Sequence, residues 1–330
     1  MRIGVVGGGV AGLAAARRLK QANHSVVVFE SQHQLGGRAA TERMGAFVFD
    51  TGATSVCPRG LAIEQAMLAE LDRTDLIRID RPIYVHEGRR TFPGDPAKNS
   101  LARYVYKPGI QHLAKLLAEG LDVRFDTTIT GIDPPASSGD SFELSCGEGI
   151  GEFDAVILTA PVPETRDLLE ASGIRRPLDN AFYRPVISIL LGYDRPLDRP
   201  FHALIDPEQV HPLTWLSIES LKSPGRAPDG QTALVAQMSA SYSRMRWESS
   251  DDLILRESLV DVSRLLGQEF SSPTESAVRR WKHAQPEQTS IFERVNPPGS
   301  KLVIAGDGVL GGRIEYAYET GIKAAELLMA

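Results

Sequence analysis

The sequence is poor in cysteine, in long apolar runs and in excess positive charge. Only Cys57 and Cys146 are present among 330 residues, far apart and without a C-x-x-C spacing. This excludes a disulfide framework and a cysteine-based zinc site. No window offers 18 uninterrupted apolar residues, so no membrane span is predicted. Lys and Arg number 36 against 42 Asp and Glu, and the resulting net charge of −6 argues against nucleic acid as the main partner.

Signals for metal binding and for export are also lacking. The seven histidines are scattered without an H-x-x-x-H or similar pair, so no metal site is predicted. The first apolar stretch is interrupted by glycines and has no small-residue cleavage site, and with so few cysteines we expect a reducing cytoplasm. With 42% hydrophobic and 24% charged residues, the chain has the composition of a globular protein of about two domains. No pattern indicates an oligomeric state.

Glycine, by contrast, is abundant, with 30 residues where an average chain of this length has about 23. The first cluster reads G-x-G-x-x-G between a predicted strand and a predicted helix. There Gly7 would allow a tight turn, Gly9 would let the backbone approach a pyrophosphate, and Gly12 would let helix and strand pack closely. The helix N-terminus at Val10 and Ala11 would offer free N–H groups to phosphates. The pattern predicts a dinucleotide site, although a purely structural β-to-α turn is the alternative.

An acidic residue follows at the spacing that such a site requires. Glu30 ends a second predicted strand 18 residues after Gly12, close to the ~20 at which a carboxylate binds ribose hydroxyls. Ser31 lies beside it. The fingerprint alone does not separate NAD from FAD.

Further clusters favour a cofactor that crosses the domain in an extended form. Gly36 and Gly37 offer a second close approach of the backbone, and Arg38 offers a guanidinium to a diphosphate. A β-run then ends in Asp50-x-Gly52-Ala53, followed by Thr54. The predicted cofactor-binding residues are Gly7, Gly9, Val10, Ala11, Gly12, Glu30, Ser31, Gly36, Gly37, Arg38, Gly52, Ala53, Thr54, Ala160, Gly306, Asp307, Gly312, Arg313 and Ile314.

The strand–glycine–helix pattern of the N-terminus returns at the C-terminus. A short apolar strand precedes Gly306 and Asp307, whose carboxylate could accept bonds from a polyol, and a helix begins near Arg313. We therefore expect an α/β fold with a Rossmann-like FAD-binding domain and an inserted α+β substrate domain. The FAD-binding domain is predicted to comprise residues 1–55, 105–162 and 296–330, and the substrate domain residues 56–104 and 163–295.

Together these motifs resemble the flavin-containing amine oxidase and protoporphyrinogen oxidase superfamily. The run Arg280–Pro286 and the Gly-Gly-Arg-Ile-Glu sequence at residues 311–315 are similar to renalase and its bacterial relatives. The resemblance implies a two-domain, p-hydroxybenzoate-hydroxylase-like architecture, non-covalent FAD and hydride transfer to flavin N5. Renalase-like enzymes oxidise dihydronicotinamide isomers of NAD(P) and pass the electrons to oxygen. One departure is that residues 54–59 replace a segment that is usually rich in aromatics.

The candidate catalytic residues are Trp281 and His283. They alternate on a predicted β-run, so they share one face, which could line the flavin pocket. Packing for Trp281 and a structural or surface role for His283 are the alternatives. Lys282 could correspond to the lysine that several amine oxidases keep near N5, or be a solvated lysine. Cys57 is expected to be a buried free thiol.

Aromatic side chains could form a substrate cage, although each fits core packing as well. They are Tyr104, Tyr106, Tyr183, Trp215 and Tyr242. The substrate is expected to be a small molecule, a dihydronicotinamide or an amine, with oxygen as acceptor. A desaturase-type flavoenzyme and a non-catalytic FAD- or NAD-binding redox sensor are the alternatives.

Overall fold

The computed structural model describes residues 1–137, 141–178 and 181–330. Its first sheet is parallel and combines strands from both ends of the chain. The strand order is β19 (Leu302–Ile304), β13 (Ala155–Leu158), β1 (Arg2–Val6), β2 (Ser25–Phe29) and β9 (Asp122–Arg124). The prediction that the two ends of the chain share one α/β unit is confirmed.

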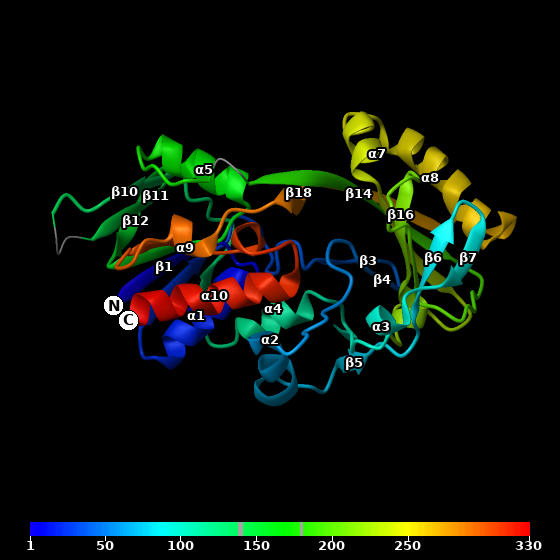
Figure 1. Cartoon of the computed structure of the whole chain (residues 1–330), viewed down its shortest axis with the longest axis horizontal. Helices are drawn as coiled ribbons and strands as arrows, with labels where there is room; N and C mark the ends of the chain where they lie inside the picture. Colours follow the sequence, from blue (N-terminus) through cyan, green and yellow to red (C-terminus); the bar gives the residue numbers. More distant parts are fainter. Residues whose placement is uncertain (138–140, 179–180) are drawn as a thin grey trace.

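Helices cover one face of this sheet and a small antiparallel sheet covers the other (Figure 1). The helices are α1 (Val10–Gln21), α10 (Ile314–Met329) and α4 (His112–Leu117). Strong helix formers such as Ala and Leu dominate α1, and its apolar residues are buried. The small sheet consists of β10 (Gly131–Asp133), β11 (Phe142–Cys146) and β12 (Glu148–Phe153). The ring of Phe153 packs edge-on against Phe29, with centroids 5.7 Å apart, and joins this sheet to β2.

The second large sheet has seven strands and is mostly antiparallel. Its order is β18 (Glu275–Gln288), β14 (Phe182–Tyr193), β17 (Thr232–Met238), β16 (Leu213–Ile218), β15 (Ala203–Ile205), β6 (Ile83–Glu87) and β7 (Arg90–Pro93). One face packs beneath α7 (Ala240–Met245), α8 (Asp251–Leu266) and η2 (Gln268–Phe270).

The opposite face of the seven-stranded sheet meets a hairpin from the first part of the chain. The hairpin consists of β3 (Thr41–Met44) and β4 (Phe47–Asp50). Phe47 and Phe49 pack against Leu190, Ala233 and Val235. Alternation along β14 and β17 explains this contact, because successive side chains of a strand face opposite sides. On its other side, Thr41 Oγ1 accepts a 3.1 Å bond from Gln111 N at the start of α4, so the hairpin joins the seven-stranded sheet to the helices of the parallel sheet.

Short elements complete the chain. They are α2 (Ala62–Gln65), η1 (Ala66–Glu70), β5 (Leu76–Arg78), α3 (Pro96–Asn99), β8 (Tyr104–Tyr106), α5 (Val162–Ala171), α6 (Glu219–Lys222), α9 (Phe292–Val295) and η3 (Asp307–Val309). Ile63 and Met67 join the core of the parallel sheet, although residues 56–104 are assigned to the substrate domain in the prediction, and those boundaries stay a prediction. Within the described ranges, no helix is both long and apolar enough to cross a bilayer.

Candidate active site

The predicted cofactor-binding residues lie at one edge of the parallel sheet. Gly7 follows β1, Glu30 follows β2, Ala160 comes two residues after β13, and Gly306 lies two residues after β19. The carboxyl ends of parallel strands lie at the same edge, where ligands bind in open α/β sheets. Segments far apart in the sequence therefore form one crevice.

The turn after β1 has the shape and the free donors for a diphosphate. Gly7 has a φ of +111°, and a Cβ there would lie 2.4 Å from Thr159 Oγ1, so only glycine fits. A Cβ at Gly9 would meet no atom within 4 Å. Helix α1 has no side-chain cap, which leaves its first N–H groups available. This open cradle at a helix N-terminus fits the pyrophosphate of a dinucleotide.

Glu30 is held in place with acceptor capacity to spare. Its Oε2 accepts a 2.7 Å hydrogen bond from Gly8 N, and its Oε1 accepts bonds from Gln32 N at 2.9 Å and Ser31 Oγ at 3.2 Å. A carboxylate has about four acceptor positions, so at least one remains for a ribose hydroxyl.

The second glycine cluster lies directly beside the first. Gly36 N donates to Gly8 O at 2.9 Å, and Gly36 forms an isolated parallel bridge with Gly9. A Cβ at Gly37 would lie 3.7 Å from Gly9 Cα. The structure thus brings together the two clusters that the sequence assigns to one ligand.

Arg38 and Asp307, here called the edge pair, bind each other in a bidentate ion pair. Both N···O distances are 2.7 Å, and the side chains are 27% and 10% exposed. Tyr183 donates to Asp307 Oδ1 at 3.2 Å, and the guanidinium lies 5.4 Å from the centre of its ring. Burial alone would lower the pKa of Arg38, but the charge of Asp307 raises it above its usual value. The prediction gave Arg38 to a diphosphate and Asp307 to a polyol, and the structure places both where one ligand could contact them.

The segment after β4 lies against Arg38. A Cβ at Gly52 would come within 2.1 Å of Arg38 O, so only glycine permits this approach, and Ala53 N donates to the same oxygen at 2.9 Å. On the other side, Trp281 Nε1 donates to Thr51 O at 2.9 Å. Predicted cofactor residues and a predicted catalytic residue therefore meet at this segment.

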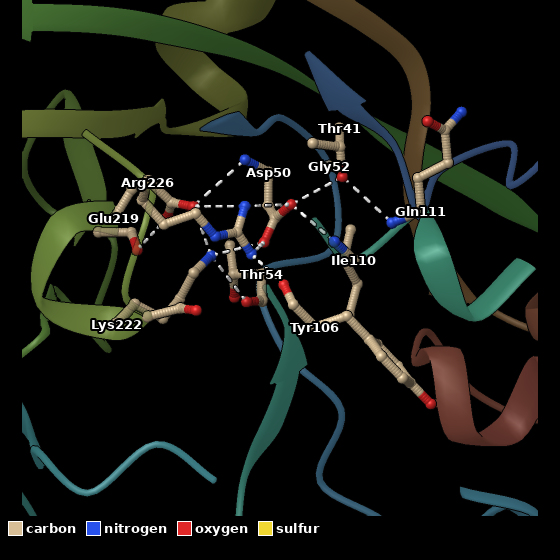
Figure 2. Close-up of polar contacts among 12 residues, drawn as sticks. Thr41, Asp50, Gly52, Thr54, Tyr106, Ile110, Gln111, Glu219, Lys222 and Arg226 are labelled. Carbon is tan, nitrogen blue, oxygen red and sulfur yellow. Dashed lines mark hydrogen bonds and ion pairs between the residues drawn. The ribbon is translucent and has the colours of Figure 1, made fainter. Parts of the chain in front are cut away.

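Asp50, at the end of β4, belongs to a buried group of four charges that we call the buried cluster (Figure 2). Lys222 Nζ lies 2.8 Å from Asp50 and 2.7 Å from Glu219, and Arg226 lies 2.9 Å from Asp50 and 3.7 Å from Glu219. All four side chains are at most 1% exposed. Two negative and two positive charges balance, which a buried site requires.

Hydrogen bonds to neighbouring elements complete the buried cluster. Asp50 Oδ1 accepts bonds from Thr41 Oγ1 and Ile110 N, both at 2.8 Å, and Ser217 Oγ donates to Glu219 at 2.6 Å. Burial alone would raise the pKa of Asp50, but the charges of Lys222 and Arg226 lower it below its usual value. Asp50 is therefore a stable carboxylate that ties the α6 region to β4.

Sequence reasoning missed Glu219, Lys222 and Arg226. No motif in the sequence distinguishes these three residues, and the adjacent Pro224 and Gly225 are typical of turns. The available signal was Asp50 itself, because a carboxylate that ends an apolar strand must find a buried partner. Sequence reasoning also assigned Tyr183 to a substrate cage or the core, whereas it contacts the edge pair.

Trp281 and His283 both lie on β18, in the stretch where its register with β14 shifts, and their shared face stays a prediction. The ring of His283 lies 5.8 Å from that of Tyr183, and its Nε2 is 4.0 Å from Glu164 Oε1. Burial, followed by the charges of Lys282 and Arg38, lowers the pKa of His283, so the imidazole is neutral at pH 7. Lys282 itself is exposed.

The remaining predicted residues lie around the start of α10. Gln285 Nε2 donates to Gly312 O at 3.1 Å, and Arg313 precedes Ile314, the first helical residue. Arg313, Arg59 and Cys57 are among the residues lining a cavity of about 110 Å³. Cys57 is a free thiol, but it is half-buried, which corrects the prediction of a buried one, because its segment runs along the surface of α10.

Comparisons with known proteins agree with this geometry. A profile of the flavin-containing amine oxidoreductases matches residues 83–329, and one of NAD(P)-binding Rossmann-like domains matches residues 5–71. The chain belongs to the flavin-containing amine oxidoreductase family. It is an FAD-dependent oxidoreductase, and its cofactor is FAD.

Solved structures share the fold across the whole chain. A protein named as a protoporphyrinogen oxidase from Exiguobacterium sp. 255-15 is 15% identical, with a TM-score of 0.80 over 100% of this chain and 99% of that one. Cyclohexylamine oxidase from Brevibacterium oxydans IH-35A is 13% identical, with a TM-score of 0.75 over 98% of each chain. These likenesses confirm the predicted α/β fold with a Rossmann-like domain.

The curated relatives are similar over shorter stretches. A 4,4'-diapophytoene desaturase of Staphylococcus aureus is 31% identical over 118 residues, which cover 34% of this chain. A namesake from Staphylococcus haemolyticus is 50% identical over 56 residues, 17% of this chain. The matches span about a quarter and about a tenth of these relatives' own lengths, 24% and 11%.

Proposed function

We propose that the protein oxidises a small molecule whose C–H bond gives up a hydride, with a dihydronicotinamide form of NAD(P) as substrate and oxygen as final acceptor. One hydride leaves the dihydropyridine ring, which becomes the aromatic nicotinamide cation; its two electrons and its proton, together with one proton from water, reduce oxygen to hydrogen peroxide. Bound non-covalently, FAD would supply the two-electron acceptor between them.

The neutral imidazole of His283 and the exposed ammonium group of Lys282 beside it support this choice of substrate. Burial is the main cause that lowers the pKa of this imidazole, followed by the charges of Lys282 and Arg38, whereas the charge of Asp167 raises it. Arg38 is paired with Asp307, and Glu164 lies 4.0 Å from His283, so exposed Lys282 is the cation left to meet a phosphate of a dinucleotide substrate. A dihydropyridine also needs no base to remove a proton before hydride transfer, which fits a site whose nearest imidazole need only position the substrate.

This chain's own residues would bind and orient. The α1 turn and Glu30 would hold the nucleotide half of the cofactor, and the edge pair would contact its central part. The face shared by Trp281 and His283 would exclude water and place the substrate. Trp281 is already fixed by its bond to Thr51 O.

The test is anaerobic mixing of the FAD-loaded protein with candidate substrates while the flavin absorbance is followed. We expect rapid bleaching by 2-dihydroNAD(P) or 6-dihydroNAD(P), slow bleaching by ordinary NADH and none by a panel of amines. Lys282→Met should raise the KM for the dinucleotide several-fold, whereas Lys115→Met, on α4 away from this face, should leave it unchanged. Bleaching by amines alone would contradict the proposal.

Amine oxidation is the second candidate, and the family match favours it. In that case His283, neutral at pH 7, would accept the proton that an ammonium substrate must lose. The amine arm of the same experiment decides between the two. Protein that purified without colour and took up no FAD would contradict both.

A further inference from the structure

The carbonyl groups of Thr51, Gly52 and Thr54 are held by side chains of the seven-stranded sheet and of α6. Thr51 O accepts two bonds, from Trp281 Nε1 at 2.9 Å and from Ser188 Oγ at 2.8 Å. Gly52 O accepts one from Gln237 Nε2 at 2.8 Å. Thr54 O accepts a 3.1 Å bond from Lys222 Nζ of α6 (Figure 2). The substrate-domain side thus fixes the peptide planes of this segment.

A fixed carbonyl also fixes the next N–H group, because the two point in opposite directions across a trans peptide. Gly52 O is held on one side, and Ala53 N accordingly points to the other, where it donates to Arg38 O. By the same geometry, Gly52 N–H points away from Trp281 and Ser188, and Ser55 N–H points away from Lys222. In the part of the chain that the structure describes, neither has a hydrogen-bond partner. They are donors available to a ligand in the crevice.

The orientation of Ser55 N–H depends on one contact, the bond from Lys222 Nζ to Thr54 O in the same peptide group. An ammonium group has three donors, and here they go to Asp50 at 2.8 Å, Glu219 at 2.7 Å and Thr54 O at 3.1 Å. The side chain is 1% exposed, so water cannot replace a lost contact. Thr51 O, by comparison, keeps a second donor if one is removed.

We propose that Lys222 is a positioning residue for the flavin: its bond to Thr54 O fixes the Thr54–Ser55 peptide so that Ser55 N–H is presented to the cofactor. The inference rests on the assignment of Gly52–Thr54 to the FAD site. Reduction adds electron density to the flavin ring, and a fixed donor stabilises that density more than a mobile one does. Lys222 thereby raises the reduction potential of the bound flavin without touching it.

The test is the double variant Glu219→Gln/Lys222→Met, which removes the Thr54 contact while Asp50 and Arg226 keep the cluster neutral. In the FAD-loaded protein we expect the equilibrium constant for flavin reduction to fall at least tenfold. For two electrons this lowers the midpoint potential, measured by dye equilibration, by about 30 mV. The flavin absorbance bands should shift as well. The matched control is Glu293→Gln/Lys323→Met, which removes an exposed pair and should leave the potential unchanged.

Two further variants keep the inference falsifiable if the double variant fails to fold. Ser55→Pro removes the donor itself and leaves the buried cluster intact, so the potential should fall by a similar factor. Ser188→Ala leaves Thr51 O with its Trp281 bond and should produce a smaller shift. An unchanged potential in Ser55→Pro, or an equal shift in Ser188→Ala, would overturn the role of Lys222. A wild-type protein that takes up no FAD would instead overturn the proposed function.

Discussion

The edge pair and the buried cluster both bring together opposite charges from distant parts of the chain, but they differ in how far they are exposed to solvent. Each joins charges that lie more than 150 residues apart in the sequence, since Arg38 pairs with Asp307 and Asp50 with Lys222. The side chains of the edge pair are 27% and 10% exposed, whereas those of the buried cluster are at most 1% exposed. A partly open pair can exchange a partner for a ligand, but a sealed cluster cannot lose a charge without leaving another uncompensated.

Arg226→Met should have the largest effect, because it leaves two carboxylates with one cation inside the protein. Removing one partner of a buried ion pair costs about 3–5 kcal/mol, and we expect the free energy of unfolding to fall by that amount in urea titration. Arg279→Met is the control, because its pair with Glu42 is 48% exposed on the arginine side and should cost about 1 kcal/mol or less. Equal losses of unfolding free energy in Arg226→Met and Arg279→Met would show that burial does not make the buried cluster more important for stability than an exposed ion pair.

Acid should destabilise the protein through a histidine beside the buried cluster. Burial and, to a smaller extent, the charge of Lys222 lower the pKa of His202 from 6.5 to about 4. The 2.6 Å bond between its Nδ1 and Arg81 O acts in the opposite direction but is outweighed. The unfolded chain therefore binds more protons between these values, so stability is complete above about pH 6.5 and is lost as the pH falls toward 4, by up to about 3 kcal/mol.

The measurement is the free energy of unfolding at pH 7 and at pH 5 in wild type and in His202→Asn. The variant should lose part of its stability at pH 7 but show the smaller decrease on acidification. His33→Asn, at an exposed position, should retain the wild-type decrease. A decrease in His202→Asn as steep as that of the wild type would show that other groups carry the acid sensitivity.

Arg38→Met should separate binding from stability at the edge pair. A hydrogen bond to a charged group contributes about 1.5–3 kcal/mol, so we expect FAD affinity to fall at least about tenfold. Since the pair is partly exposed, the apoprotein should lose only about 1 kcal/mol. Flavin fluorescence titration and urea unfolding of the apoprotein measure the two quantities. Unchanged FAD affinity in Arg38→Met would show that Arg38 binds Asp307 but does not contact the cofactor.

The smallest effect is expected for Tyr183→Phe. The variant removes the 3.2 Å bond to Asp307 and keeps the ring beneath Arg38. At 3.2 Å this bond is long for a hydroxyl donor, so we expect it to contribute less than the about 1.5–3 kcal/mol of a close hydrogen bond to a charged group, and FAD affinity should fall only several-fold in the same titration. A loss as large as that of Arg38→Met would assign the tyrosine a direct contact with the cofactor.

The sequence was sufficient for the crevice because its requirements are local. A positive φ at Gly7 and the close approach at Gly52 restrict those positions to glycine, and such restrictions leave a mark in a single sequence. The buried cluster leaves no such mark. The role of its other members, Glu219, Lys222 and Arg226, can be recognised only from their contacts with Asp50. Those contacts depend on the packing of the β3–β4 hairpin on the seven-stranded sheet. The residues that would face the substrate depend on the same long-range packing.

The long ribbon of β14 and β18 has a mechanical consequence. These strands of 12 and 14 residues run from the neighbourhood of the edge pair into the seven-stranded sheet (Figure 1), and they are hydrogen-bonded along most of that length. Their register shifts lie between Phe182 and Tyr183 and between Arg184 and Val186. Bulges are where a ribbon bends most easily. A rotation of the seven-stranded sheet relative to the parallel sheet would therefore bend these two strands beside Tyr183, next to the residues that we propose contact FAD.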